Sequence, residues 1–170
     1  MDWLHISLRI VHIAAGIIWV GSAVFLVVFI TPTAKELGPQ AGPFMAHLNQ
    51  RRRMPVVLSA SSILTILAGI WLYWRDSDGF DPGWVTSSVG LAFTVGAVAA
   101  ILAFLLGLVV ARPRVVRQGE LGAAMASGTP SQEQVQEMGA LQRALRTINI
   151  LNLALLATAV VAMSVARYLG

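Results

Sequence analysis

The chain has 170 residues, of which 56% are hydrophobic and 12% charged, and its formal net charge is +4. Soluble domains carry about a quarter charged residues, so this composition indicates a membrane protein. The chain has no cysteine, which excludes disulfides, thiolate metal sites and covalent c-type haem, and its basic residues lie at the ends of apolar runs rather than in a nucleic-acid-binding domain.

Four apolar segments are long enough to cross a bilayer, and together they make one domain covering residues 1–170. The expected transmembrane helices span about residues 4–30, 55–74, 84–111 and 145–168. Pro32 is expected to end the first helix, and the third is expected to stop before Arg112 because Pro113 follows. The sequence therefore predicts an all-α protein, a four-transmembrane-helix bundle with short cytoplasmic interfacial helices.

The segments between the spans carry helix signals of their own. Apolar residues follow Pro43 at helical spacing, which indicates a short interfacial helix before the second span. Thr129 and Pro130 indicate the start of a cytoplasmic helix that continues into the fourth span. The stretch between Arg117 and Gly128 is rich in glycine and alanine, and is expected to be a mobile linker.

The loop charges predict the orientation of the bundle. Nine of the twelve basic residues lie in the first and third loops: Lys35, Arg51, Arg52, Arg53, Arg112, Arg114, Arg117, Arg143 and Arg146. The positive-inside rule places these loops in the cytoplasm and both termini outside. We therefore expect a multi-pass protein of the bacterial inner (plasma) membrane, with the lipid bilayer as its partner and no nucleic acid. A homodimer or a larger membrane complex is an open alternative.

The first span carries its polar residues on a single stripe. Steps of three or four residues, the spacing of one helix face, separate the members of the series His5, Arg9, His12, Gly16, Trp19 and Ala23. His12 lies about 10 Å along the axis from His5, and ionisable residues at that depth usually face the bundle interior and mark function. The structural alternative is that Arg9 extends to the outer headgroups and His12 hydrogen-bonds a neighbouring helix.

This stripe suits a b-type haem. His12 would supply an imidazole ligand to the iron and Arg9 would pair with a propionate, while Gly16 and Trp19 would border the macrocycle. Copper bound by His12 and His5 is the competing metal site, although the two histidines are two helical turns apart.

The second axial ligand of such a haem has no strong candidate in the sequence. His5 and Met163 are considered for haem binding, and Arg167 is a second candidate partner for a propionate. The remaining histidine, His47, lies in the cytoplasmic loop and is expected to be an interfacial residue.

His12, Gly16, Trp19 and Gly21 form the pattern His-x3-Gly-x2-Trp-x-Gly. This pattern resembles the first helix of a set of bacterial membrane proteins that includes the copper-resistance protein D family, the HemJ-type protoporphyrinogen oxidases and the membrane domain of cytochrome c-linked urate oxidases. The resemblance implies a helical membrane fold and assigns haem binding to His12. The chain departs from the set, because it has no intramembrane lysine of the HemJ type and no methionine- and histidine-rich extramembrane segments.

The preferred interpretation is a haem-b-binding membrane protein that acts in electron transfer or as a subunit of a redox complex. The sequence does not decide whether the chain is itself a haem-dependent oxidoreductase, and it identifies no catalytic residue. The alternatives are a non-enzymatic accessory or transporter-like membrane protein and a copper-handling protein.

Overall fold

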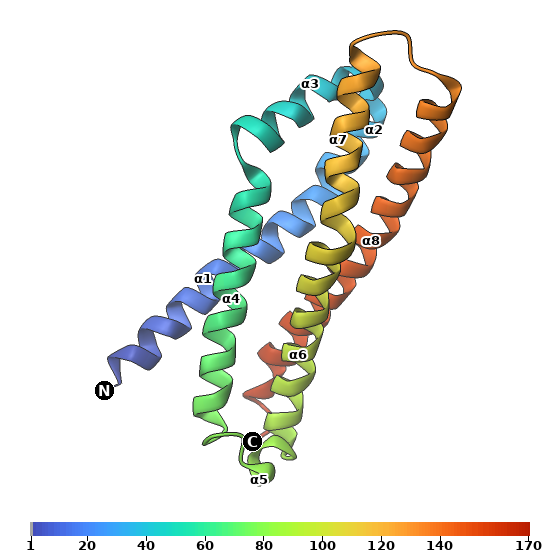
Figure 1. Cartoon of the computed structure of the whole chain (residues 1–170). Coiled ribbons are helices and arrows are strands. Elements are labelled where there is room, and N and C mark those ends of the chain that lie inside the picture. The colour runs from blue at the N-terminus through green and yellow to red at the C-terminus, as the bar shows by residue number, and fades with distance from the viewer. Residues whose placement is uncertain (1) are drawn as a thin grey trace.

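The computed structural model describes residues 2–170, and these form helices and no strand. Four continuous helical stretches are long and apolar enough to cross a membrane: Trp3–Leu37, Met54–Asp76, Ser88–Ala126 and Gln132–Ala166. The two termini lie at the same end of the molecule, as four crossings require (Figure 1). The predicted all-α fold with four membrane-spanning helices is confirmed.

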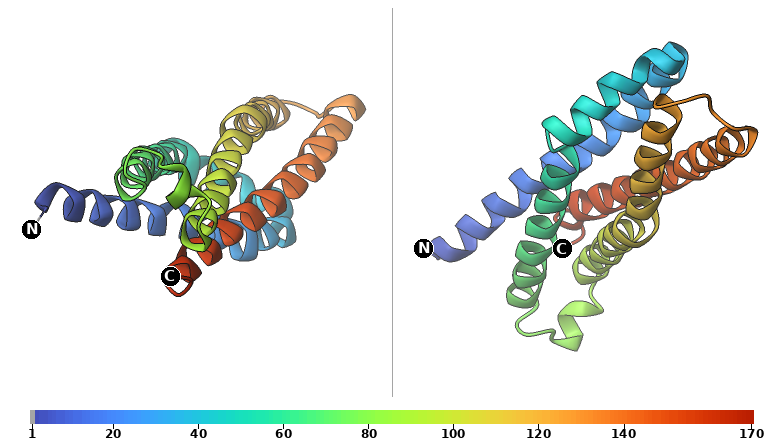
Figure 2. Two further views of the ribbon diagram at one scale, coloured as in Figure 1. Left: turned by 90° about the horizontal axis from the view of Figure 1, so that it is seen from below. Right: turned by 45° about the horizontal axis from the view of Figure 1, so that its top comes forward.

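Two helix pairs make up the bundle. α1 (Trp3–Phe25) packs on α4 (Met54–Asp76), and α6 (Ser88–Leu105) packs on α8 (Gln132–Ala166), with far fewer contacts between the pairs. The N-terminal half of α1 projects away from α6 and α8 (Figures 1 and 2). In that half, the cross-helix contacts of α1 are therefore made to α4.

Trp19 lies where the two pairs meet. Its side chain is 8% exposed and packs in one cluster with Ala103 of α6 and Leu156 of α8, which are 0% and 1% exposed. An indole buries a large apolar area, so this contact contributes a substantial share of the packing between the pairs. The cross-pair core is thus centred on the first helix's tryptophan.

Small residues and one amide bring α6 and α8 together. A Cβ atom on Gly96 would lie 2.7 Å from the Cγ atom of Met163, so the glycine makes room for the methionine. Asn152 donates from Nδ2 to the carbonyl oxygen of Ala103 at 3.0 Å. Close approach and interhelical hydrogen bonds are the usual means of helix association in lipid, and the bond of Asn152 is of the kind expected for a buried asparagine.

Pro32 does not end the first helix, so that prediction was wrong. A π-helical turn, η1 (Leu26–Ile30), precedes α2 (Thr31–Leu37), and the N–H of Thr31 donates to the carbonyl oxygen five residues back. The wider turn accommodates a residue that has no N–H and whose ring crowds the preceding turn. The helix therefore continues past the end of the predicted span.

The third helix continues past Pro113 in the same way. η4 (Leu106–Ala111) is a π-helical turn, and α7 (Arg112–Ala126) follows it directly. Arg114 donates from Nη1 to the carbonyl oxygen of Val110 at 2.7 Å, which satisfies an acceptor in the disturbed turn. The expected mobile linker is therefore helical almost throughout, a second correction.

The connection before α4 and the start of α8 agree better with the prediction. η2 (Gly38–Gln40), α3 (Ala41–Ala46) and η3 (His47–Arg51) form a short helical connection before α4, where an interfacial helix was predicted. α8 begins outside the predicted apolar span and continues into the fourth span as expected. Its cap is Ser131, in a capping box with Gln134, rather than Thr129.

α7 and α8 extend beyond the apolar spans and are joined by an ion pair. Arg117 donates from Nε and Nη2 to the Glu137 carboxylate at 2.7 and 3.0 Å. This bidentate contact lowers the pKa of Glu137 and raises that of Arg117, first through the hydrogen bonds and then through charge attraction. The pair is partly exposed to solvent and joins the two helices at the end of the bundle opposite the termini (Figure 1).

At the opposite end, aromatic rings hold the turn between α4 and α6. α5 (Pro82–Val85) lies in this connection, and Asp81 caps it by accepting from the N–H of Trp84 at 2.8 Å. The Trp84 ring stacks on Phe93 and meets Tyr73 edge-on, with centroids 6.2 and 5.3 Å apart. Aromatic side chains thus form part of the packing at this end of the bundle.

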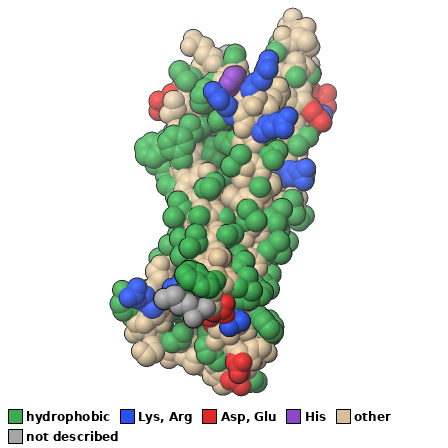
Figure 3. Space-filling model, turned by 90° about the vertical axis from the view of Figure 1, so that its left-hand side faces the viewer, with side chains coloured by type: hydrophobic (Ala, Val, Ile, Leu, Met, Phe, Trp, Pro, Cys, Tyr) green, Lys and Arg blue, Asp and Glu red, His purple; other side chains and the backbone are tan. Residues whose placement is uncertain are grey.

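The surface has the distribution expected of a protein surrounded by lipid. Hydrophobic side chains cover the middle of the molecule, and charged side chains gather toward its ends (Figure 3). Each spanning stretch leaves large apolar side chains about 60% exposed: Ile10 62%, Leu67 60%, Val109 64% and Val161 61%. In water such a surface would drive aggregation, so the bilayer is the environment in which this fold is stable.

Candidate functional site

The candidate site is the seam between α1 and α4, defined here as the contacts that the polar stripe of α1 makes with α4. At the end of the seam near the N-terminus, Asp2 caps α1 by accepting from the N–H of His5 at 3.2 Å and forms an ion pair with Arg75. Nδ1 of His5 lies 3.8 Å from Oδ1 of Asp76, and the His5 ring centroid lies 6.3 Å from that of Trp71. His5 is therefore held by an acidic and aromatic neighbourhood on α4.

His12 occupies the middle of the seam and contacts the α4 backbone. Its Nδ1 atom lies 2.8 Å from the carbonyl oxygen of Thr65. A Cβ atom on Gly69 would lie 2.8 Å from Cε1 and 3.0 Å from Nδ1 of the same ring. Any residue larger than glycine at position 69 would force the imidazole to move. α4 therefore provides both a hydrogen-bond acceptor for the His12 ring and the space in which the ring packs.

The hydrogen bond selects one tautomer of the neutral imidazole. A carbonyl oxygen can only accept, so Nδ1 of His12 carries the proton and the neutral ring has its lone pair on Nε2. Among residues 2–170, every buried side-chain nitrogen or oxygen has a partner, and Nε2 of His12 has none, so Nε2 reaches the surface of the chain. The ring is therefore oriented through Nδ1, and Nε2 has no hydrogen-bond partner in the described chain.

Gly16 and Trp19 continue the stripe but make packing contacts. A Cβ atom on Gly16 would lie 3.7 Å from Cγ2 of Thr65, which is ordinary van der Waals contact, so this glycine lets α4 approach closely. Trp19 is directed into the cluster with α6 and α8 described above. Both residues therefore have a structural role in helix packing.

The other predicted site residues do not gather around His12. Arg9 is exposed and forms no ion pair or side-chain hydrogen bond within residues 2–170, and Arg167 lies with Cζ 4.9 Å from the ring centroid of Tyr168. Met163 packs against Gly96 in the other helix pair. His47 belongs to η3, at the opposite end of α4 from Trp71 and Arg75.

Within the part of the chain that the structure describes, no three His, Cys, Asp or Glu side chains are placed to hold one metal ion. His5 and His12 contact different turns of α4, through Asp76 and Thr65 respectively. The arrangement provides single imidazole ligands at two levels rather than a chelating pair, which does not favour the copper alternative.

Thr65 and Gly69 are the parts of the site that sequence reasoning did not assign. Both belong to a face of the second span that the spacing of Ser62, Thr65 and Gly69 marks as a helix-packing face. The spacing identified the packing face but not the side chain that contacts it. Every residue has a backbone carbonyl, so the residue type does not reveal which carbonyl accepts a hydrogen bond.

No family model, curated protein or solved structure matches the chain. The class of protein therefore rests on the fold and the seam alone. The chain is an all-α, multi-pass membrane protein of two helix pairs, in which a hydrogen-bonded histidine joins α1 to α4.

Proposed function

We propose that the chain is a haem-b-binding membrane protein in which Nε2 of His12 is an axial ligand of the iron, acting in electron transfer or as a subunit of a redox complex. The observation that carries the proposal is the hydrogen bond from Nδ1 of His12 to the carbonyl oxygen of Thr65. Ligating histidines almost always donate their second N–H to a carbonyl or carboxylate, which sets the tautomer and strengthens the ligand.

The residues present fit one axial position. An oriented neutral imidazole with a free Nε2 is a suitable iron ligand, and the unpaired guanidinium of Arg9, one turn nearer the outer end, suits a propionate. Met163 packs on α6, so the described chain supports a haem with one protein ligand from α1. The bound haem would supply one-electron chemistry, and the chain would orient it and control access to it.

A second candidate function rests on the same hydrogen bond. A histidine that bonds a neighbouring helix and packs on its glycine is also a structural element, and Arg9 is exposed as a side chain extending toward headgroups would be. In this interpretation the chain is a non-enzymatic accessory subunit of a membrane complex.

A spectrum separates the two candidates. The protein is expressed with sufficient haem, purified in detergent, and examined by reduced-minus-oxidised absorption. We expect a Soret band and α-band in the wild type and in His47→Ala, and their loss in His12→Ala. A colourless wild type that takes up no haem would leave only the accessory function, and equal loss in both variants would reject His12 as the ligand.

We also infer that the termini and α5 face outward across the plasma membrane, with α3 and the α7–α8 extension in the cytoplasm. The bias of basic residues toward the loops at that end supports this orientation. Since the chain has no cysteine, single substitutions Thr86→Cys and Gly128→Cys can be labelled in intact cells with a membrane-impermeant thiol reagent. We expect labelling at position 86 only, and labelling at position 128 alone would invert the topology.

A further inference from the structure

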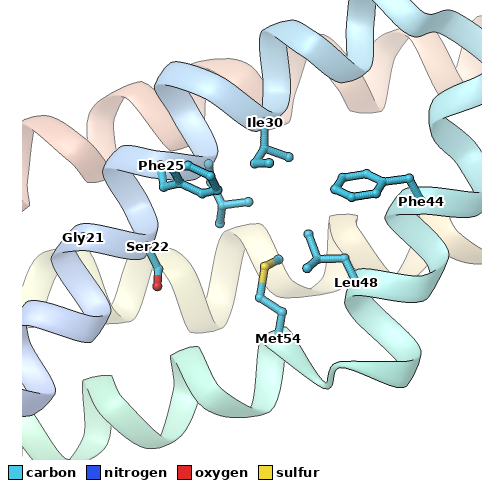
Figure 4. Close-up of a pocket in the computed structure, with 8 residues that line it drawn as sticks. Gly21, Ser22, Phe25, Ile30, Phe44, Leu48 and Met54 are labelled. Carbon is cyan, nitrogen blue, oxygen red and sulfur yellow. The ribbon is translucent and has the colours of Figure 1, made fainter.

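An apolar cavity of about 470 Å³ lies at the cytoplasmic end of the α1–α4 pair. It is lined by Gly21, Ser22, Phe25, Leu26, Ile30, Phe44, Leu48 and Met54. The labelled side chains from α1, η1, η3 and α4 point toward one another around this space, with Phe44 of α3 across from them (Figure 4). The volume falls within the range of ordinary ligand sites, and the single side-chain polar group is the hydroxyl of Ser22.

Gly21 is one of the residues that line the cavity. A Cβ atom built on it meets nothing within 4 Å, so the glycine faces open space rather than a packed neighbour. Phe25 and Phe44 remain 56% and 52% exposed, although both line the cavity. An apolar chain from the surrounding bilayer gains van der Waals contacts when it fills such a space.

A run of three arginines lies between two lining residues of the cavity in the sequence. Arg51, Arg52 and Arg53 follow the lining residue Leu48 and directly precede the lining residue Met54. All three are exposed, and none of them forms an ion pair with a carboxylate in the described chain. Since α4 begins at Met54, the run lies where the apolar span meets the polar interface. The cavity therefore combines an apolar interior with a cationic rim at headgroup level.

We propose that this cavity is a binding site for an anionic phospholipid. One acyl chain lies among Phe25, Ile30 and Phe44, and the headgroup phosphate contacts the arginine run at residues 51–53. Basic pockets at the cytoplasmic side of helix bundles recognise anionic headgroups, and the charge complementarity selects such a lipid over a zwitterionic one. The site lies at the opposite end of the seam from His5, and it does not depend on haem binding.

The test uses the full-length protein in detergent and native mass spectrometry with an equal mixture of phosphatidylglycerol and phosphatidylcholine of identical acyl chains. We expect the wild type to retain phosphatidylglycerol with at least tenfold preference, since each nearby arginine contributes roughly fivefold. Arg51→Gln combined with Arg52→Gln should remove most of that preference. The matched charge control, Arg143→Gln combined with Arg146→Gln on α8, should leave it unchanged.

A second variant tests the cavity itself. Gly21→Leu fills the space from a position that is free of clashes, and should lower retention of both lipids at least fivefold, whereas Gly119→Leu on α7, which also faces open space, should not. Unchanged lipid binding in Gly21→Leu, or equal retention of the two lipids by the wild type, would overturn the proposal. A dimer that persists without lipid and dissociates in Gly21→Leu would assign the cavity to a second copy of the chain, and would overturn it too.

Discussion

Gly69→Ala is the substitution that most directly tests the packing of the His12 ring against α4. The new Cβ atom would lie 2.8 Å from Cε1 of the imidazole, whereas carbon atoms pack at about 3.5 Å or more, so the ring must retreat by about 0.7 Å. The bond from Nδ1 to Thr65, now 2.8 Å, would then lengthen toward about 3.5 Å and be lost.

The expected magnitude follows from three contributions. Loss of an interhelical hydrogen bond in a membrane protein costs about 0.6–1.7 kcal/mol. Overpacking costs about 1–3 kcal/mol, and replacing a helical glycine by alanine returns about 0.5–1 kcal/mol. We therefore expect Gly69→Ala to lower the free energy of unfolding by about 1–4 kcal/mol. Reversible unfolding in mixed micelles, followed by tryptophan fluorescence and circular dichroism, can measure this change.

A matched control and a double-mutant cycle sharpen this experiment. Gly16→Ala lies on the same seam, but its Cβ atom would make an ordinary contact at 3.7 Å, so its stability should stay within about 0.5 kcal/mol of the wild type. In His12→Ala the ring is gone, and adding Gly69→Ala should then cost nothing further. Additive effects in the cycle, or a Gly69→Ala variant as stable as the wild type, would refute the proposed contact.

Three further predictions concern the rest of the bundle. Gly96→Leu should destabilise the α6–α8 pair by about 2–4 kcal/mol in the same unfolding assay, because even its Cβ atom would lie 2.7 Å from Met163, and Met163→Ala should recover part of the loss. Asn152→Leu should cost about 0.5–1.5 kcal/mol, since it removes the donor to Ala103. The pKa of Glu137 is lowered below its ordinary value of 4.5 by Arg117, so the pair stabilises the α7–α8 extension above that value and loses its effect as the pH falls through the lowered pKa. Hydrogen exchange of α7 should accordingly be faster in Glu137→Gln than in the wild type at pH 7, and the difference should disappear once the pH falls below the lowered pKa of Glu137; a difference that persists there would contradict the assignment.

The sequence predicted the number and type of the spans because hydropathy over about 20 residues is dominated by the cost of burying polar groups in lipid. It failed at Pro32 and Pro113, where a proline was treated as the end of a helix. The structure keeps both helices continuous by widening the preceding turn, and Arg114 supplies a side-chain donor. Whether a proline stops a helix depends on neighbouring hydrogen bonds, which local composition does not encode.

The candidate site was predicted in part. Helical spacing placed His12 and Trp19 on one face, and both are at least partly buried, with Trp19 in the core. The spacing could not reveal that α4 is the partner of His12, nor that Trp19 turns toward α6 and α8. Those outcomes depend on the crossing of helices, which is decided by small residues such as Gly69 on the opposing helix. The haem and its second ligand stay predictions for the spectrum to test.

The pairing of consecutive spans has a consequence for biosynthesis. α1 and α4 are complete once residue 76 has left the ribosome, so the bond between His12 and Thr65 can form before α6 and α8 are made. We expect the first hairpin to lie in the bilayer with Trp19 unpacked until the second hairpin is made. The second hairpin then packs on Trp19 through Ala103 and Leu156. We therefore expect the hairpins to assemble in the order in which they are translated. Two separately expressed hairpins, divided in the turn after Ser77, should associate in the membrane by packing on Trp19.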